Sequence, residues 1–348
     1  MIVGGKMISL KKTAVALAAA ALVLAGCSAA NSGDKKADGA DKVVTILTHD
    51  SFKISEEDIK AFQEESGYQL KTVSAGDGTV LNQLLINKDK PVVDGFYGVD
   101  TFQAAEVINS GLAEEFVPKG LEKSDTVDGK LSPIDRGDVC LNADNRWFAD
   151  KNIDIPKSFD DLLKPEYKNL TVLTDPLQST PGMAFLAATV STYGDKWTEY
   201  WKDLLANGTK VVKDWSTAYY TEFSGSEGKG AYPIVLSYSS SPAYEKGATS
   251  SLNDTCIKQI EYAGVTKGAK NADGAKAFIE FLLTDKVQKS IPENMYVYPY
   301  KKNIELPKEW ATYAPLPTTV IEADIQKVGA ERKAWLDEYS KIYQESTK

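Results

Sequence analysis

The chain has 348 residues, of which 43% are hydrophobic and 26% charged, which is the balance of a globular protein large enough for two lobes. Its 40 basic and 49 acidic side chains give a formal net charge of -9. Because nucleic-acid binding depends on basic groups that neutralise phosphates, this charge argues against a nucleic-acid ligand. It mildly favours a cationic ligand, although net charge acts first on solubility.

The N-terminus predicts export. Three lysines precede an apolar run from Thr13 to Leu24, which is too short for an ordinary membrane-spanning helix and suits the core of a signal peptide. The residues Leu-Ala-Gly-Cys follow at once, and this pattern resembles a bacterial lipobox ending at Cys27. We therefore predict a signal peptide at 1–26 and a lipid on Cys27 that anchors the protein to the outer face of the cell membrane. The alternative is a secretion signal with an incidental cysteine.

Residues 27–42 are small, polar and charged, so they predict a flexible tether between the lipid and the folded chain. Apart from Cys27, the only cysteines are Cys140 and Cys256. In an exported protein such a pair predicts a disulfide, the alternative being two separate buried thiols.

From Val43 onward, short apolar strands alternate with helical periods, which is the pattern of an α/β protein. Strands are predicted at 43–47, 70–73, 92–99, 170–173 and 232–238. Helices are predicted at 55–65, 80–86, 102–110, 113–116, 158–163, 181–193, 197–205, 272–283 and 322–345. Ser55 and Thr180 are the expected N-caps of the helices that follow them, and Pro181 suits a first helical position. A turn is expected at 76–79 and a crossover near 138–142.

Acidic and hydroxyl side chains stand directly after predicted strands, where open α/β sheets bind their ligands. Asp50 and Ser51 follow the first strand, and Asp100 follows the strand at 92–99. Ser179 and Thr180 precede a helix whose first amides would suit an anion such as phosphate.

Three stretches, at 215–219, 237–244 and 295–299, concentrate rings and hydroxyls in expected loops. Aromatic faces attract cations by about 0.5 to 2 kcal/mol each and stack on flat heterocycles. A single ring is more often packing than a ligand wall, but several at strand ends beside an acid favour a binding site.

Catalysis lacks support in the sequence. His49 is the one histidine, and no nucleophile elbow, zinc spacing or calcium loop occurs. Gly76-x-Gly78 lacks the Lys-Ser/Thr ending of a phosphate-binding loop. We predict no catalytic residue, no metal and no cofactor.

Seven stretches, taken in order, resemble the thiamine-binding proteins of bacterial ABC transporters, a family of periplasmic binding proteins. They are THDSF (48–52), AGDGTVLNQL (75–84), YGVDTF (97–102), TDPLQSTPGMAFL (174–186), DWSTAYYTEF (214–223), LSYSSSPAYE (236–245) and IPENMYVYP (291–299). A further stretch, IPKSFDDLL (155–163), is shared more broadly by such two-lobed proteins.

This resemblance implies a type II periplasmic-binding-protein fold with two lobes that close on the ligand about a hinge. The N-terminal lobe would comprise 43–137 and 262–303, and the C-terminal lobe 138–261 and 304–348. The hinge would then lie near the two cysteines, where a disulfide would brace the crossover.

The resemblance also implies a set of ligand-binding residues. Asp100 would pair with the aminopyrimidine of thiamine or balance its charge, and Trp215 would stack on a ring of the ligand. Ser179 and Thr180 would meet the hydroxyethyl end or its phosphate. The whole predicted set is Asp50, Ser51, Asp100, Ser179, Thr180, Trp215, Tyr219, Tyr238, Ser241 and Tyr296. Tyr296 stands in place of a family tryptophan and His49 in place of a tyrosine.

The expected ligand is therefore thiamine or a thiamine phosphate, and the expected partner is a membrane permease driven by a separate ATPase. A monomer held to the membrane by its lipid alone is expected. The alternatives are the same fold with a polyamine, ferric iron or another heterocyclic cation, an extracellular hydrolase, or a lipoprotein that binds a partner protein.

Overall fold

The computed structural model describes residues 42–75 and 80–347, and these described residues belong to one compact unit. Three predicted features lie outside the described residues: the signal peptide at 1–26, the tether from Cys27 to just before residue 42, and the turn at 76–79. No helix in the described ranges combines the length and the apolar character needed to cross a bilayer.

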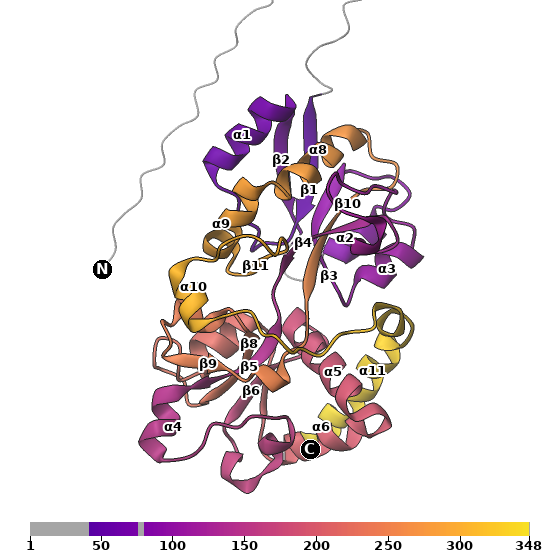
Figure 1. Ribbon diagram of the computed structural model, residues 1–348. Coiled ribbons are helices and arrows are strands. Elements are labelled where there is room, and N and C mark those ends of the chain that lie inside the picture. The colour runs from indigo at the N-terminus through magenta and orange to yellow at the C-terminus, as the bar shows by residue number, and fades with distance from the viewer. Residues whose placement is uncertain (1–41, 76–79, 348) are drawn as a thin grey trace, which may run out of the picture. The chain divides into compact units, whose positions relative to one another are not determined.

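Two β-sheets organise the described chain (Figure 1). The first has six strands in the order β11 (Tyr298–Pro299), β4 (Leu131–Arg136), β10 (Ile260–Val265), β3 (Gly95–Asp100), β1 (Val43–Thr48) and β2 (Gln69–Ser74). β1 is parallel to both β2 and β3, whereas β10 runs antiparallel to β3 and β4.

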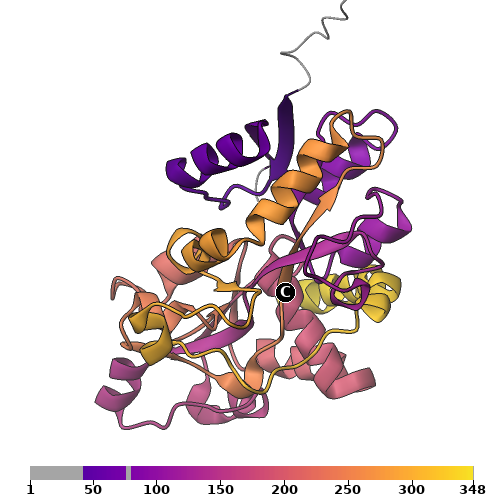
Figure 2. The ribbon, with the colours of Figure 1, turned by 45° about the horizontal axis from the view of Figure 1, so that its top comes forward.

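Helices cover both faces of the first sheet, and each face has its own core. On one face lie α1 (Glu56–Ser66), α8 (Ala272–Leu282) and α9 (Asp285–Met295), and Figure 2 shows α8, in orange, alongside the strands. On the other face lie α2 (Val80–Ile86) and α3 (Ala104–Asn109). Ile46 and Leu47 belong to different cores because successive residues of a strand point to opposite faces.

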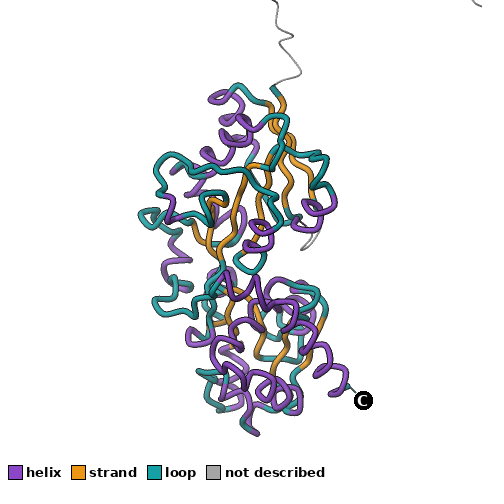
Figure 3. Tube along the Cα trace, turned by 90° about the vertical axis from the view of Figure 1, so that its right-hand side faces the viewer, coloured by secondary structure: helices purple, strands orange, loops and turns teal. Residues whose placement is uncertain are grey.

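The second sheet has five strands in the order β7 (Lys210–Val212), β6 (Thr171–Thr174), β8 (Ile234–Tyr238), β5 (Val139–Asp144) and β9 (Thr249–Ser251). Its largest core lies under α5 (Thr180–Tyr193), α6 (Trp197–Ala206) and α11 (Ile325–Ser346). The opposite face packs against the π-helix η5 (Thr217–Glu222). Figure 3 shows the strands of both sheets among these helices.

Short helices occupy several connections. They are α4 (Asn145–Lys151), α7 (Ser241–Tyr244), α10 (Lys308–Tyr313) and the 3-10 helices η1 (Lys123–Asp125), η2 (Asp160–Leu163), η3 (Pro165–Tyr167), η4 (Gly194–Lys196) and η6 (Asn253–Thr255). The predicted helix at 158–163 is thus a 3-10 turn.

The predicted α/β class is confirmed, and so are local signals such as the cap of α1. Ser55 accepts the N–H of Asp58, and Gly67 ends the helix in the left-handed region. The predicted strand at 92–99 begins only at Gly95. The Asp94 side chain, just before it, accepts the N–H of Thr45 at 2.9 Å and so ties the loop to β1.

The predicted helix at 113–116 is wrong. Ala113 forms an antiparallel bridge with Thr266, and the N–H of Glu114 donates to the carbonyl of Val265 at 2.9 Å. The backbone here is extended because these hydrogen bonds come from a segment about 150 residues away, which local propensity cannot anticipate.

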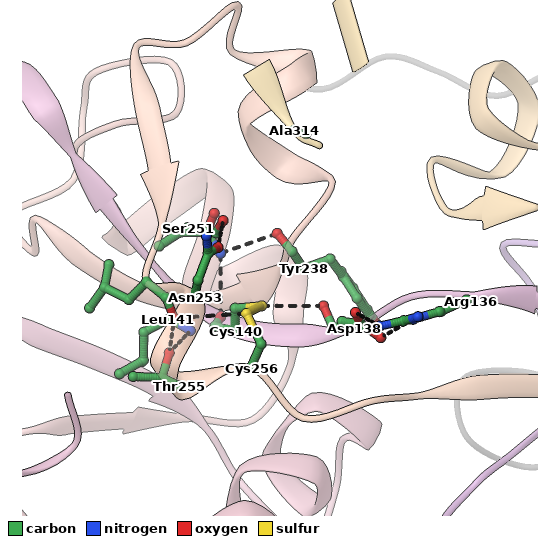
Figure 4. Close-up of a disulfide and its surroundings, with 12 residues drawn as sticks. Arg136, Asp138, Cys140, Leu141, Tyr238, Ser251, Asn253, Thr255, Cys256 and Ala314 are labelled. Carbon is green, nitrogen blue, oxygen red and sulfur yellow. Dashed lines mark hydrogen bonds and ion pairs between the residues drawn. A yellow bond between two sulfur atoms is a disulfide. The ribbon is translucent and has the colours of Figure 1, made fainter. Parts of the chain in front are cut away.

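Cys140 and Cys256 form a disulfide (Figure 4). Val139 and Ile257 exchange two backbone hydrogen bonds, of 3.0 and 2.9 Å, so the cysteines beside them fall on the next, closer pair of an antiparallel ladder. Their Cα atoms are 4.2 Å apart. The bond joins the start of β5 to the segment that leads into β10, and these are two of the connections between the sheets.

Candidate ligand-binding site

Three parallel strands of the second sheet end at one edge. β6 is parallel to β7 and to β8, so their carboxyl ends at Thr174, Val212 and Tyr238 lie on the same side of the sheet. The segments that follow carry Ser179, Thr180 and Trp215. The fold thus places at one edge of the sheet side chains that lie up to 36 positions apart in the sequence, as expected for an α/β site.

An aromatic group lies at this edge. We use this name for Trp215, Tyr219, Tyr220, Tyr238, Tyr244 and Tyr296. Trp215 stacks on Tyr219 with ring centroids 4.8 Å apart and planes at 17°. Tyr238 is tilted against Trp215 at 6.4 Å, and Tyr220 meets the indole edge-on at 5.3 Å. The three predicted rings of Trp215, Tyr219 and Tyr238 therefore form one contact group. Tyr220, which was not predicted, is a fourth member.

Hydroxyl groups hold the indole in place. The Trp215 Nε1–H donates to Ser237 Oγ at 2.9 Å, and Ser237 Oγ lies 2.8 Å from Ser241 Oγ. The predicted residue Ser241 thus supports Trp215 through Ser237. Because a buried indole N–H needs an acceptor, this pair fixes the orientation of the ring.

Tyr296 reaches the group from the segment between α9 and β11. Its ring meets Tyr244 at 5.7 Å, and its carbonyl accepts the hydroxyl of Ser240 at 2.8 Å. Its backbone is left-handed, with φ of 57°, and its side chain is 52% exposed. Both rings of this pair are therefore open to a ligand.

The start of α5 differs from the prediction in one respect. Ser179, not Thr180, is the N-cap, because its Oγ accepts the N–H of Gly182 at 3.0 Å. Gly182 is required here, since a Cβ would lie 2.5 Å from the carbonyl oxygen of Thr174. With that N–H taken and none on Pro181, the helix start offers an anion fewer amides than the sequence suggested.

Asp100 ends β3 and faces α5. One carboxylate oxygen accepts the N–H of Phe102 at 2.8 Å, and the other accepts the hydroxyl of Thr180 at 3.0 Å. The residue is only 3% exposed. Burial, together with the nearby charge of Glu261, raises the pKa of Asp100 to about 6, although the hydrogen bond from Thr180 opposes the shift.

Asp100 is one of three carboxylates at paired positions on three adjacent strands of the first sheet. The strand register places Asp100 and Asp135 opposite Glu261, on either side of β10. The Tyr97 hydroxyl lies within hydrogen-bonding distance of both Asp135 and Glu261, and His49 Nε2 lies 3.3 Å from Glu261. Burial and Glu261 raise the pKa of Asp135. Burial also acts to raise the pKa of Glu261, but the charge and hydrogen bond of His49 outweigh burial, so the pKa of Glu261 is lowered.

The carboxylates and the rings are linked. Tyr97 Oη lies 3.6 Å from the sulfur of Met295, whose neighbour Tyr296 contacts Tyr244. Carboxylates and π faces are the two kinds of group that attract an organic cation.

Asp50 and Ser51 stand apart from these contacts. Both are exposed after β1, and Asp50 accepts a hydrogen bond from Ser74 at the end of β2. The structure therefore places them at the carboxyl ends of β1 and β2, at one edge of the first sheet.

Several residues of this site were missed by the sequence predictions. Glu245, just after α7, accepts the Tyr219 hydroxyl at 3.2 Å. Glu261 and Asp135 lie on strands that were not predicted. A signal was present for Glu261, which is the one acid in the run Ile260–Val265 that becomes a largely buried strand, whereas β4 carries Ser132 and Arg136 beside Asp135.

The family model of the bacterial extracellular solute-binding proteins matches residues 84–319. The chain belongs to this family.

Relatives of this solute-binding protein confirm the resemblance drawn from its motifs. The thiamine-binding periplasmic protein of Salmonella typhimurium is 30% identical over 321 residues, which cover 87% of this chain and 94% of that protein. A solved structure of a periplasmic thiamin binding protein is 27% identical, with a TM-score of 0.73 over 86% of this chain and 96% of that one.

A third comparison confirms the two-lobed type II fold. The iron-bound HitA protein of Pseudomonas aeruginosa has a TM-score of 0.71 at 20% identity, over 86% of this chain and 99% of that one. In the ranges that the structure describes, no group of three or more His, Cys, Asp or Glu residues is placed to hold a metal. As a member of its family, this solute-binding protein binds a solute and is not an enzyme.

Proposed function

We propose that this solute-binding protein is a lipoprotein that captures thiamine and delivers it to the permease of an ABC importer. The observation that carries the proposal is the stacked pair of Trp215 and Tyr219, which follows the carboxyl end of β7, while Asp100 at the end of β3 bonds to Thr180 at the start of α5. Thiamine joins a permanently charged thiazolium to a flat aminopyrimidine, so π faces and carboxylates suit both its rings. Relatives with the name of thiamine-binding proteins support the same ligand.

The proposed ligand lies between the two lobes, which close on it about the paired connections next to the disulfide. Sheet membership supports lobes at 43–137 with 262–303 and at 138–261 with 304–348, since nearly all strands fall on the expected side. β10, from Ile260, begins two residues before the expected boundary. The protein acts as a monomer, and phosphate esters of thiamine enter the same site.

Within this proposal, Asp100, Ser179 and Thr180 contact one end of the ligand. Trp215, Tyr219, Tyr238 and Tyr296 surround its rings, and Ser241 supports them. Asp50 and Ser51 contribute from the end of β1.

Replacing Trp215 by Ala is expected to weaken thiamine binding about thirtyfold, because it removes both stacking and cation–π attraction. Isothermal titration calorimetry of the chain from Ser28 onward measures the effect. Trp215→Phe is the matched control. It keeps a flat ring, and we expect it to retain most of the affinity although it loses the hydrogen bond to Ser237. Unchanged affinity of the alanine variant would remove Trp215 from the site.

Replacing Cys27 by Ser is expected to move the full-length protein from the membrane fraction to the soluble fraction, because no lipid can be attached. Immunoblots of fractionated cells measure the distribution. Ser28→Ala is the control and should stay with the membranes. If Cys27→Ser also stays there, the predicted anchor is wrong.

A further inference from the structure

We propose that Glu245 is the carboxylate that recognises the positive charge of the ligand, so that the site distinguishes a cationic ring from a neutral ring of the same shape. The inference rests on the proposed function and names a residue that determines its specificity. Five observations support it.

Glu245 lies directly beside the stacked rings. It follows α7, which in turn follows β8, and its Oε1 accepts the Tyr219 hydroxyl at 3.2 Å. Tyr219 is the ring on which Trp215 stacks. The carboxylate is therefore one hydrogen bond away from the aromatic surface that a flat ligand would meet.

Within the described residues Glu245 forms no ion pair, although the charge of Arg146 acts to lower the pKa of its carboxyl group. Neighbouring acids do form ion pairs. Arg146 pairs with Asp144 at 3.7 Å, and Lys229 pairs with Glu227 at 3.0 Å. The hydroxyl groups that act on Glu245, those of Tyr219 at 3.2 Å and of Ser226, are neutral, and burial raises the pKa of the Tyr219 phenol above its ordinary value.

Glu245 is also half-buried, and burial raises the pKa of its carboxyl group, against the hydrogen bond from Tyr219. A carboxylate that is partly removed from water and forms no ion pair of its own bears a desolvation cost. A cationic ligand would offset that cost, whereas a neutral ligand would not.

Exposed rings stand around this carboxylate. Tyr220, Tyr244 and Tyr296 are 39%, 60% and 52% exposed. Tyr220 lies close enough to Tyr244, Glu245 and Tyr296 for their charges to raise its pKa further, after the effect of burial. Large rings this open are usual at ligand or partner sites, and together with an acid they favour a cation.

The other acids of the site are less available. Both oxygens of Asp100 are occupied by Phe102 and Thr180, and Glu261 is paired with His49. Of the four carboxylates, Glu245 alone combines partial exposure, contact with the aromatic group and a neutral partner.

The test compares thiamine with 3-deazathiamine, in which a carbon atom replaces the charged nitrogen and leaves a neutral ring. Both are titrated calorimetrically into the wild-type protein and the Glu245→Gln variant. Gln keeps the size of the side chain and can still accept the Tyr219 hydroxyl. We expect the wild type to prefer thiamine, and the variant to lose about tenfold in affinity for thiamine and none for 3-deazathiamine.

Glu227→Gln is the matched control, since it removes the same charge from an exposed acid that already pairs with Lys229. It should leave both affinities unchanged. An equal loss for both ligands in Glu245→Gln, or no loss for thiamine, overturns the assignment of Glu245 while thiamine binding stands. A wild-type protein that binds neither ligand overturns the proposed function together with this inference.

Discussion

Replacing both Cys140 and Cys256 by Ser lowers the free energy of unfolding by about 3 to 5 kcal/mol. The two residues are 116 positions apart, so the bond closes a long loop and removes much conformational freedom from the unfolded chain. It also fastens the start of β5 to the segment before β10, as Figure 4 shows. Urea unfolding of the chain from Ser28 onward, followed by circular dichroism, measures the change.

A reductant provides the control. It should destabilise the wild type to the level of the double variant and leave the double variant unchanged. Free alkylation of both thiols in the native, unreduced protein would show that the bond does not form in solution.

Replacing Asp100 by Asn is expected to stabilise the protein by up to about 3 kcal/mol at pH 7.5. The pKa of this buried carboxyl is raised from 3.8 to about 6, and each unit corresponds to about 1.4 kcal/mol. The unfolded chain therefore loses this proton at a lower pH than the folded chain does. The contribution of Asp100 to stability falls as the pH rises from about 4 to about 6, and it stays low above that range.

Asn has the same shape, and its carbonyl oxygen can still accept the N–H of Phe102. The variant should thus exceed the wild type in stability at pH 7.5, and the difference should vanish near pH 4. Urea unfolding at the two pH values measures this difference. A variant that is less stable than the wild type at both would show that hydrogen bonding, not desolvation, dominates at this position.

The same substitution tests the binding role. A carboxylate that a protein keeps at a cost in stability is a candidate functional group. If Asp100 pairs with thiamine, the more stable Asn variant should bind it about tenfold more weakly.

Local sequence patterns predicted the strands that are continuous and apolar. β1, β6 and β8 were placed to within two residues at each end, as were the long helices α5 and α6. β4 and β10 were missed. Both carry acids, β4 also contains Pro133, and they are extended because their neighbours in the sheet supply hydrogen bonds. These strands lead to and from the second sheet, so the connection between the lobes was the least predictable part from local propensity.

The site was predicted in the same uneven way. The rings at 215, 219 and 238 lie within distinctive motifs and do meet one another. The acids could not be sorted by sequence, because burial and pairing decide which of them faces a ligand. Asp100 follows a predicted strand and was found. The position of Glu261 opposite Asp100 depends on the register in which β10 pairs with β3. The contact of Glu245 with Tyr219 depends on the position of η5.

The six tryptophans of the chain occupy two kinds of surroundings. Four are buried and a fifth packs against the largest core, namely Trp197, Trp201, Trp310, Trp335 and Trp147. Trp215 alone belongs to the aromatic group. The fluorescence emission of this single indole can therefore report ligand binding, whereas the emission of the other five reports unfolding of the hydrophobic cores. One unlabelled sample thus carries two separate optical probes, and Trp215→Phe silences only the first.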